Sequence, residues 1–285
     1  MLGYDKKLFI LPFDHRTSFI KGLLGEKAEL SNEDIKYLKE EKEIIYEGFK
    51  KGIDLGIPKD EAAILVDEEF GKEILENAVI NSIAILVSVE KSGEKEFIFE
   101  FSDFENHLNA FSPTFAKVLL HTESFKEIES KNRQIEKLKK VNEFCRKNSI
   151  KFLIEPLTYR QAADELLTEQ ILIIEELNNS GIEPDVWKLE GSEQKENYEK
   201  IVNVARKEGR DRVGIVILGG GEDKEKVEKI IEAGSKVNGV IGFAIGRTIF
   251  WQPLISLKQK QITADEAIEE IAKNYLYFYK VFENK

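Results

Sequence analysis

Cysteine and histidine are scarce in this chain, and their scarcity excludes several kinds of site. Cys145 is the only cysteine among 285 residues, so the sequence offers no internal disulfide and no cysteine metal cluster. The three histidines, His15, His107 and His121, lie in unrelated segments without the paired spacing of metal-binding motifs. The sequence therefore predicts neither a metal site nor a bound cofactor.

Long apolar runs and an excess of positive charge are also missing. No stretch approaches the roughly 20 apolar residues of a membrane-spanning helix. The first residues lead directly into a strand-like segment, without the pattern of a signal peptide. Lysine and arginine number 42 against 53 aspartates and glutamates, a net charge of −11. We therefore expect a cytoplasmic protein whose partner is neither a nucleic acid nor a membrane.

Apolar, strand-like runs alternate with amphipathic helical stretches along the chain. Eight such runs are spread over its length, at residues 8–14, 63–67, 83–89, 116–121, 151–156, 184–190, 213–218 and 240–245. This order predicts an α/β fold, a single (β/α)8 barrel domain over residues 1–285, with an open doubly wound sheet as the runner-up. Residues 90–113 interrupt the alternation of strand-like and helical stretches, and they predict an elaborated loop over the barrel mouth.

Lys188 lies in an apolar segment that is typical of a strand buried on both faces in a parallel sheet. Because side chains alternate along a strand, Lys188 shares one face with Val186 and Glu190, and Trp187 points to the other. A lysine in such a strand must lose its charge or find a carboxylate. Since a neutral amine attacks carbonyl carbon, Lys188 is the candidate nucleophile.

Polar side chains gather at the predicted carboxyl ends of the strands, where barrels of this type place their active sites. In chain order these ends carry Asp14 and Arg16, Asp67, Glu90 and Lys91, Lys117 and His121, Glu155, Lys188 and Glu190, and then Gly246 and Arg247. Structural roles are also open. Asp14, Asp67 and Glu155 are suited to capping helices, and Lys117 is suited to a buried ion pair.

The last two strand ends indicate a phosphorylated ligand. The glycines at 219–221 can turn backbone N–H groups toward an anion, and Arg247 can hold the same group as a fork. Phosphate-binding barrels use these two loops for phosphate. With Lys188 as the amine, and with Asp14 and Glu155 to move protons, these parts predict a Schiff-base lyase acting on a sugar phosphate.

These residues stand in motifs that resemble a known family. The chain resembles class I tagatose-1,6-bisphosphate aldolases at Asp14-His15-Arg16, Val66-Asp67-Glu68-Glu69-Phe70-Gly71, Glu90-Lys91-Ser92-Gly93, Glu155-Pro156-Leu157-Thr158-Tyr159, Asp185-Val186-Trp187-Lys188 and Gly246-Arg247-Thr248. It is more similar still to the aldolase-like domain (DUF2090) often fused to 5-dehydro-2-deoxygluconokinase in inositol catabolism. That similarity is carried by Phe13-Asp14-His15-Arg16, Glu90-Lys91-Ser92-Gly93, Glu183-Pro184-Asp185-Val186-Trp187-Lys188 and Gly242-Phe243-Ala244-Ile245-Gly246-Arg247-Thr248.

The resemblance spans nearly the whole chain and implies a (β/α)8 barrel with class I, metal-free aldol cleavage. It places Lys188 on the family's Schiff-base lysine, Glu155 on the carboxylate beside it, and Asp14, Lys91 and Arg247 on substrate-contacting positions. The predicted catalytic residues are accordingly Lys188, Glu155, Asp14 and Lys91. The predicted substrate-binding residues are Arg16, Asp67, Lys117, Glu190, Gly219, Gly220, Gly221, Gly246 and Arg247.

The substrate implied is a phosphorylated ketose or keto sugar acid. The leading candidate is 2-deoxy-5-keto-gluconate 6-phosphate, cleaved to dihydroxyacetone phosphate and malonate semialdehyde; tagatose or fructose bisphosphate is the alternative. The loop Leu218-Gly219-Gly220-Gly221-Glu222 departs from the serine-alanine-glycine type of the tagatose enzymes, so we expect different phosphate contacts.

Two further interpretations come from other classes of protein: a barrel isomerase with Glu155 as the base, and a noncatalytic sugar-phosphate binder. The C-terminal helical segment is rich in aromatic rings, at Tyr275, Tyr277, Phe278, Tyr279 and Phe282. It predicts either a subunit contact in a homo-oligomer or a helix that closes the bottom of the barrel.

Overall fold

The computed structural model describes residues 2–159 and 162–284 and forms a closed barrel of eight parallel strands. The strands are β1 (Leu8–Pro12), β2 (Ala62–Leu65), β3 (Ala84–Ser88), β4 (Phe115–His121), β5 (Lys151–Leu157), β6 (Val186–Glu190), β7 (Gly214–Leu218) and β8 (Val240–Ala244). They pair in chain order, and β8 closes on β1. The predicted single (β/α)8 barrel is confirmed and the open sheet is wrong. Residues 1, 160–161 and 285 of the predicted range lie outside the described part.

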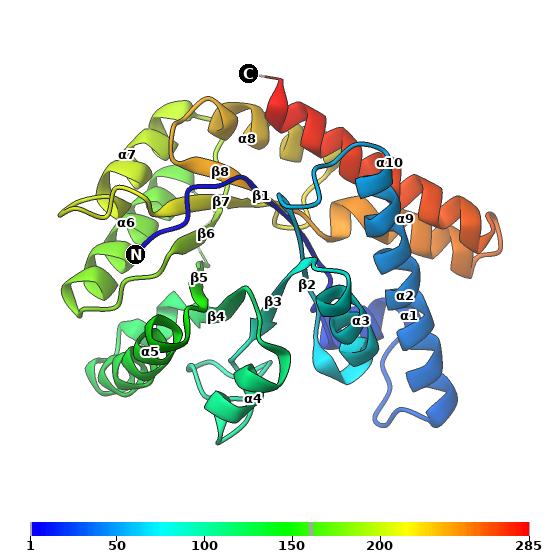
Figure 1. Cartoon of the computed structure of the whole chain (residues 1–285), viewed down its shortest axis with the longest axis horizontal. Helices are drawn as coiled ribbons and strands as arrows, with labels where there is room; N and C mark the ends of the chain where they lie inside the picture. The colour runs from blue at the N-terminus through cyan, green and yellow to red at the C-terminus, as the bar shows by residue number, and fades with distance from the viewer. Residues whose placement is uncertain (1, 160–161, 285) are drawn as a thin grey trace.

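Helices surround the strands on the outside of the barrel (Figure 1). They are α1 (Thr17–Leu24), α2 (Asn32–Asp54), α3 (Glu68–Ile80), α4 (Phe104–Phe111), α5 (Ile128–Asn148), α6 (Ala163–Asn179), α7 (Lys195–Ala205), α8 (Lys224–Ser235), α9 (Arg247–Lys258) and α10 (Ala264–Glu283), with a short 3-10 helix at Thr122–Phe125. The two long helices α2 and α10 both begin with a capping box, Ser31 with Asp34 and Thr263 with Glu266, which satisfies backbone N–H groups of the first turn.

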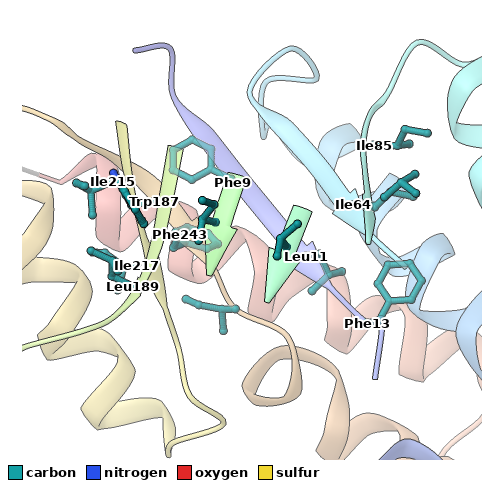
Figure 2. Close-up of a cluster of buried hydrophobic side chains, with 14 of the residues drawn as sticks. Phe9, Leu11, Phe13, Ile64, Ile85, Trp187, Leu189, Ile215, Ile217 and Phe243 are labelled. Atoms are coloured by element: carbon teal, nitrogen blue, oxygen red, sulfur yellow. The ribbon is translucent and has the colours of Figure 1, made fainter. Parts of the chain in front are cut away.

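Alternation along the strands divides the core into two layers. Side chains that point outward pack under the helices, as Figure 2 shows for Phe9, Ile64, Trp187, Ile215 and Phe243. Side chains that point inward fill the lower barrel, and they are Leu8, Ile10, Ala63, Leu65, Leu86, Phe115, Leu153, Val186 and Val216, with Ile241 and Ala244. The inner layer forms an apolar floor, so charged groups above it are cut off from water on that side.

The segment after β3 is only partly the irregular loop that the sequence predicts. Its first half turns back on itself, since Lys91 N donates to Ile98 O and Glu100 N donates to Val89 O. Its second half contains α4, which the sequence interpretation missed. Asp103 caps this helix, and Phe104 and Leu108 form a buried i, i+4 pair too short to stand out as a helical period.

The aromatic rings of α10 are accounted for inside the chain. The helix, red in Figure 1, packs along α2 and α9. Tyr275, Phe278 and Phe282 are buried, and the Tyr275 hydroxyl donates to Phe9 O at 2.6 Å. The helix therefore covers the outer side of β1, and association into a homo-oligomer stays a prediction. Among the described residues, no helix combines the length and the apolar character needed to cross a bilayer.

Candidate active site

The carboxyl ends of the strands open into one cavity of about 1410 Å³. Parallel strands bring these ends to the same rim, so residues far apart in sequence meet there. Every site residue predicted from the sequence lies in the wall of this cavity: Asp14, Arg16, Asp67, Lys91, Lys117, Glu155, Lys188, Glu190, Gly219, Gly220, Gly221, Gly246 and Arg247. They differ in how deeply they are buried and in what they contact.

Lys188 points into the barrel from β6, and its side chain is 4% exposed. Strand register explains its partner. Ile154 of β5 pairs with Trp187 of β6, so the next inward position of β5 is occupied by Glu155, level with Lys188. Glu155 Oε1 lies 2.8 Å from Lys188 Nζ. A buried amine therefore stands against a buried carboxylate at the base of the cavity.

Lys117 of β4 lies at the centre of a cluster of carboxylates. Its Nζ lies 2.6 Å from Glu90 Oε1, 3.3 Å from Glu155 Oε2 and 3.6 Å from Asp14 Oδ2. Glu155 thus bridges the two buried lysines, one with each oxygen. Two cations and three carboxylates form one network from β1, β3, β4, β5 and β6, closed below by the apolar floor.

Burial and charge act in opposite directions on the acids of this network. Burial would raise the pKa of Asp14, but the Lys117, His15 and Lys188 charges outweigh it and lower that pKa to about 2. The pKa of Glu155 is likewise lowered, because Lys188 and Lys117 outweigh the burial that would raise it. Burial prevails only at Glu90, whose pKa is raised despite Lys117. Asp14 and Glu155 are therefore the anionic members.

The central lysine is held in its charged form. Burial alone would lower the pKa of Lys117, but Glu90, Glu155 and Asp14 outweigh that effect and raise the pKa above its ordinary value. Lys117 is thus a fixed cation beside Glu155. Lys188 Nζ is the other ion-pair partner of Glu155.

The two helices that follow β7 and β8 differ in how their first turns are capped. The start of α8 is already occupied, because the Asp223 carboxylate accepts from Lys226 N. The start of α9 has Gly246 as its N-cap and no side-chain cap. Ile249 N donates to Gly246 O, so the N–H groups of Arg247 and Thr248 are the ones that a ligand could reach. Arg247 is exposed and donates to Gly220 O at 3.0 Å. Binding of an anion by the glycine loop and Arg247 stays a prediction, and the start of α9, which has no side-chain cap, lies beside them.

The glycine loop makes room for this arginine. Gly220 and Gly221 have φ of +64° and +76°, in the left-handed region that side chains disfavour. A Cβ on Gly221 would lie 2.4 Å from the Arg247 guanidinium. Glycine is required at 221 because the guanidinium lies directly over the backbone there.

One known protein family matches nearly the whole chain. Residues 3–285 match the DUF2090 family, described as an uncharacterized protein conserved in bacteria. The chain belongs to the DUF2090 family. No curated protein sequence matches it.

Solved structures with the same fold resemble this DUF2090 chain over nearly its whole length. Cgl0159 from Corynebacterium glutamicum is 16% identical, with a TM-score of 0.62, and the match covers 96% of this chain and 87% of the other. A Schiff-base-forming fructose-1,6-bisphosphate aldolase is 14% identical with a TM-score of 0.60, covering 96% and 93%. An archaeal fructose-1,6-bisphosphate aldolase, with its catalytic lysine bound to a carbinolamine intermediate, is 14% identical with a TM-score of 0.61, covering 97% and 94%.

Glu90, to which the sequence interpretation gave no role, points into the cluster, and Lys91 does not. Glu90 continues the inward alternation of Ser88, is buried, and contacts Lys117. Lys91 points out to the rim, where its side chain is 50% exposed and lies 3.4 Å from Glu94. Strict period-two counting from Ser88 would have identified Glu90. The cation beside Lys188 and Glu155 is therefore Lys117, and Lys91 stands outside the cluster.

Asp67 is bound within the protein by a residue that the sequence gave no reason to select. Lys42 of α2 is fully buried and forms an ion pair with Asp67, and it also donates to Phe13 O at 2.7 Å. The other Asp67 oxygen accepts from Phe70 N and caps α3. Both carboxylate oxygens have partners within the protein, and substrate binding by Asp67 stays a prediction.

Two more predicted binding residues are held by neighbours at the rim. Arg16 lies 3.2 Å from Glu100 and 4.0 Å from Glu69. Glu190 accepts from the Thr158 hydroxyl at 3.0 Å, and burial raises its pKa. The residues in contact with Lys188 or one step from it are thus Glu155, Lys117, Asp14 and Glu90. Among the described residues, no group of three or more metal-ligating side chains is arranged to hold a metal ion.

Proposed function

We propose that this protein is a class I aldolase, a carbon-carbon lyase that binds a phosphorylated ketose as a Schiff base on Lys188. The observation that carries the proposal is the buried Lys188 Nζ, 2.8 Å from Glu155 at the base of the cavity. An amine with one carboxylate partner and an open side toward the cavity can exchange its proton and attack a carbonyl. The Schiff-base lysines of the similar fructose-bisphosphate aldolases support this assignment.

The first steps use the contact between the amine and the carboxylate. Lys188 passes a proton to Glu155, and the neutral Nζ attacks the ketose carbonyl carbon. A proton of the attacking nitrogen then passes to the carbonyl oxygen, which gives the neutral carbinolamine and leaves Glu155 protonated. Glu155 then returns a proton to the carbinolamine hydroxyl, which leaves as water while the C=N bond forms. Lys117, 3.3 Å from the second oxygen of Glu155, keeps that carboxylate in place through both transfers.

Cleavage follows from the positive charge of the iminium. Glu155 takes the proton of the hydroxyl on the second carbon beyond the iminium carbon, and the bond between the first and second carbons breaks. Its electrons form a C=C bond to the iminium carbon, and the electron pair of the C=N bond moves to the nitrogen. An aldehyde leaves and an enamine stays on Lys188. Asp14, anionic because its pKa is lowered to about 2, accepts hydrogen bonds from substrate hydroxyls. Protonation and hydrolysis of the enamine free the second product and Lys188.

The phosphate end of the substrate is assigned to Arg247 and the start of α9. The resemblance to DUF2090 aldolase-like domains favours 2-deoxy-5-keto-gluconate 6-phosphate, which would give dihydroxyacetone phosphate and malonate semialdehyde in inositol catabolism. Tagatose and fructose bisphosphates are the alternative that the tagatose aldolase motifs suggest. Both kinds of substrate have the phosphate on the carbon next to the carbonyl.

Borohydride trapping tests the proposal directly. Dihydroxyacetone phosphate should form an imine with Lys188, and borohydride should reduce that imine to a stable amine. The peptide that contains Lys188 should then carry the added mass. Lys188→Met removes the amine and keeps the packing, so it should show no adduct. An unmodified Lys188 under conditions that trap a known class I aldolase would refute the Schiff base and favour an isomerase or a noncatalytic binder.

A further inference from the structure

We infer that the substrate carries one phosphate only, and that Glu69 and Glu100 exclude a second phosphate by occupying Arg16. This inference rests on the proposed aldolase function and chooses between its two kinds of substrate. It starts from the uneven distribution of charge around the cavity mouth.

One cation of the cavity wall is available to an anion. Within the described residues, every lysine and arginine of this wall lies within ion-pair distance of a carboxylate, with the exception of Arg247. Arg247 donates to the backbone oxygen of Gly220 and has further N–H groups to offer. With the uncapped start of α9, it forms a site for one phosphate.

The opposite side of the mouth is acidic. In a closed barrel of eight strands, β3 lies across from β7, so the segment after β3 faces the glycine loop. A ketose with its phosphate at Arg247 and its carbonyl at Lys188 directs its remaining carbons toward β1–β4. The cavity wall there contains the carboxylates Glu68, Glu69, Glu94, Glu96 and Glu100. Two lysines on this side of the wall, Lys72 and Lys91, each lie within ion-pair distance of a carboxylate.

Arg16 is the one arginine on that side of the cavity wall, and it is already paired. Its guanidinium lies 3.2 Å from Glu100 and 4.0 Å from Glu69, and its side chain is only 22% exposed. A second phosphate would have to displace both carboxylates and then remain close to them. Like charges at such distances repel strongly where water is partly excluded. The part of the substrate released as the aldehyde therefore carries no phosphate.

Nonreacting sugar alcohols test this directly, because their binding needs no turnover. We would measure the affinity of the wild-type protein for mannitol 1-phosphate and for mannitol 1,6-bisphosphate by calorimetry. The bisphosphate should bind about tenfold more weakly, since it brings two negative charges to the acidic side. Arg247→Met should weaken both ligands together.

Glu69→Gln with Glu100→Gln should free Arg16 and reverse the order, so that the bisphosphate binds more tightly than the monophosphate. The matched control is Glu40→Gln, which removes a carboxylate from an exposed pair with Lys36, and neither of these residues lines the cavity. It should leave the ratio of the two affinities unchanged.

The outcomes separate this inference from the proposed function. Tighter binding of the bisphosphate to the wild-type protein would overturn the inference, even if dihydroxyacetone phosphate is trapped on Lys188. Failure of both ligands to bind would overturn it as well, because the phosphate site would then be absent. Failure of trapping, with the expected ratio of affinities, would remove the aldolase proposal and leave a site for one phosphate.

Discussion

Two buried lysines in this barrel have opposite surroundings. Lys42 reaches from α2 into the wall, where Asp67 and the backbone oxygens of Phe13 and His15 accept its hydrogen bonds. An ammonium has three N–H groups, so these three acceptors use the whole hydrogen-bonding capacity of Lys42. Lys188 points into the cavity, and Glu155 is its one ion-pair partner among the described residues. Burial of a lysine therefore does not indicate function by itself; unused hydrogen-bonding capacity facing a cavity does.

The largest expected effect is a loss of activity when Lys188 is replaced, with no such loss when Lys42 is replaced. Lys188→Met should abolish borohydride trapping and lower turnover of a cleaved ketose by roughly a thousandfold or more, because the nucleophile is gone. Its melting temperature should stay close to that of the wild type, because Glu155 keeps Lys117 as a partner at 3.3 Å. Lys42→Met is the matched control, because it replaces the same kind of side chain outside the cavity. The folded fraction of the Lys42→Met variant should still form the borohydride-reduced adduct on Lys188.

The second effect concerns stability, and here the substitution of Lys42 should have a larger effect than the substitution of Lys188. Lys42→Met leaves Asp67 buried without its cation, and removing one partner of a buried pair costs about 3–5 kcal/mol of unfolding free energy. Denaturant titration would measure the loss. The double variant Lys42→Met with Asp67→Asn should recover part of it. An unchanged midpoint for the single variant would contradict a scaffold role for this pair.

Glu90 and Lys91 test where the boundary of the cluster lies. Glu90→Gln keeps the shape of the side chain but removes a carboxylate 2.6 Å from Lys117, and we expect a loss of about tenfold in kcat. Lys91→Met, at the exposed rim, should stay within about twofold, as exposed substitutions usually do. Steady-state kinetics of the two variants would decide. A larger effect at Lys91 would restore its predicted catalytic role.

The smallest effect is a dependence of stability on pH. The pKa of Asp14 is lowered to about 2 in the folded protein, so its contribution to stability is present above its unfolded pKa near 4 and is lost as pH falls. Between pH 5 and pH 3, the wild type should lose about 1 kcal/mol more unfolding free energy than Asp14→Asn. Equal losses in the two proteins would show that the network does not hold Asp14 ionised.

The sequence determined the barrel and the residues at its mouth. Eight apolar runs separated by helical stretches correspond to the eight strands of the structure. Because parallel strands share one carboxyl end, residues such as Asp14, Glu155, Lys188 and Arg247 had to meet. Alternation also predicted the face of Lys188, since period two is a local property of the chain.

Only the tertiary structure decided which of these residues contact one another. Lys42 gave no signal, because a lysine within an amphipathic helix looks solvated until α2 packs against the end of β2. The sequence also did not show how the helices after β7 and β8 begin: Asp223 caps α8, whereas α9 begins without a side-chain cap. Strand register set Glu155 beside Lys188 and Lys117 below both. These contacts depend on distances between separate elements, which no pattern along the chain specifies.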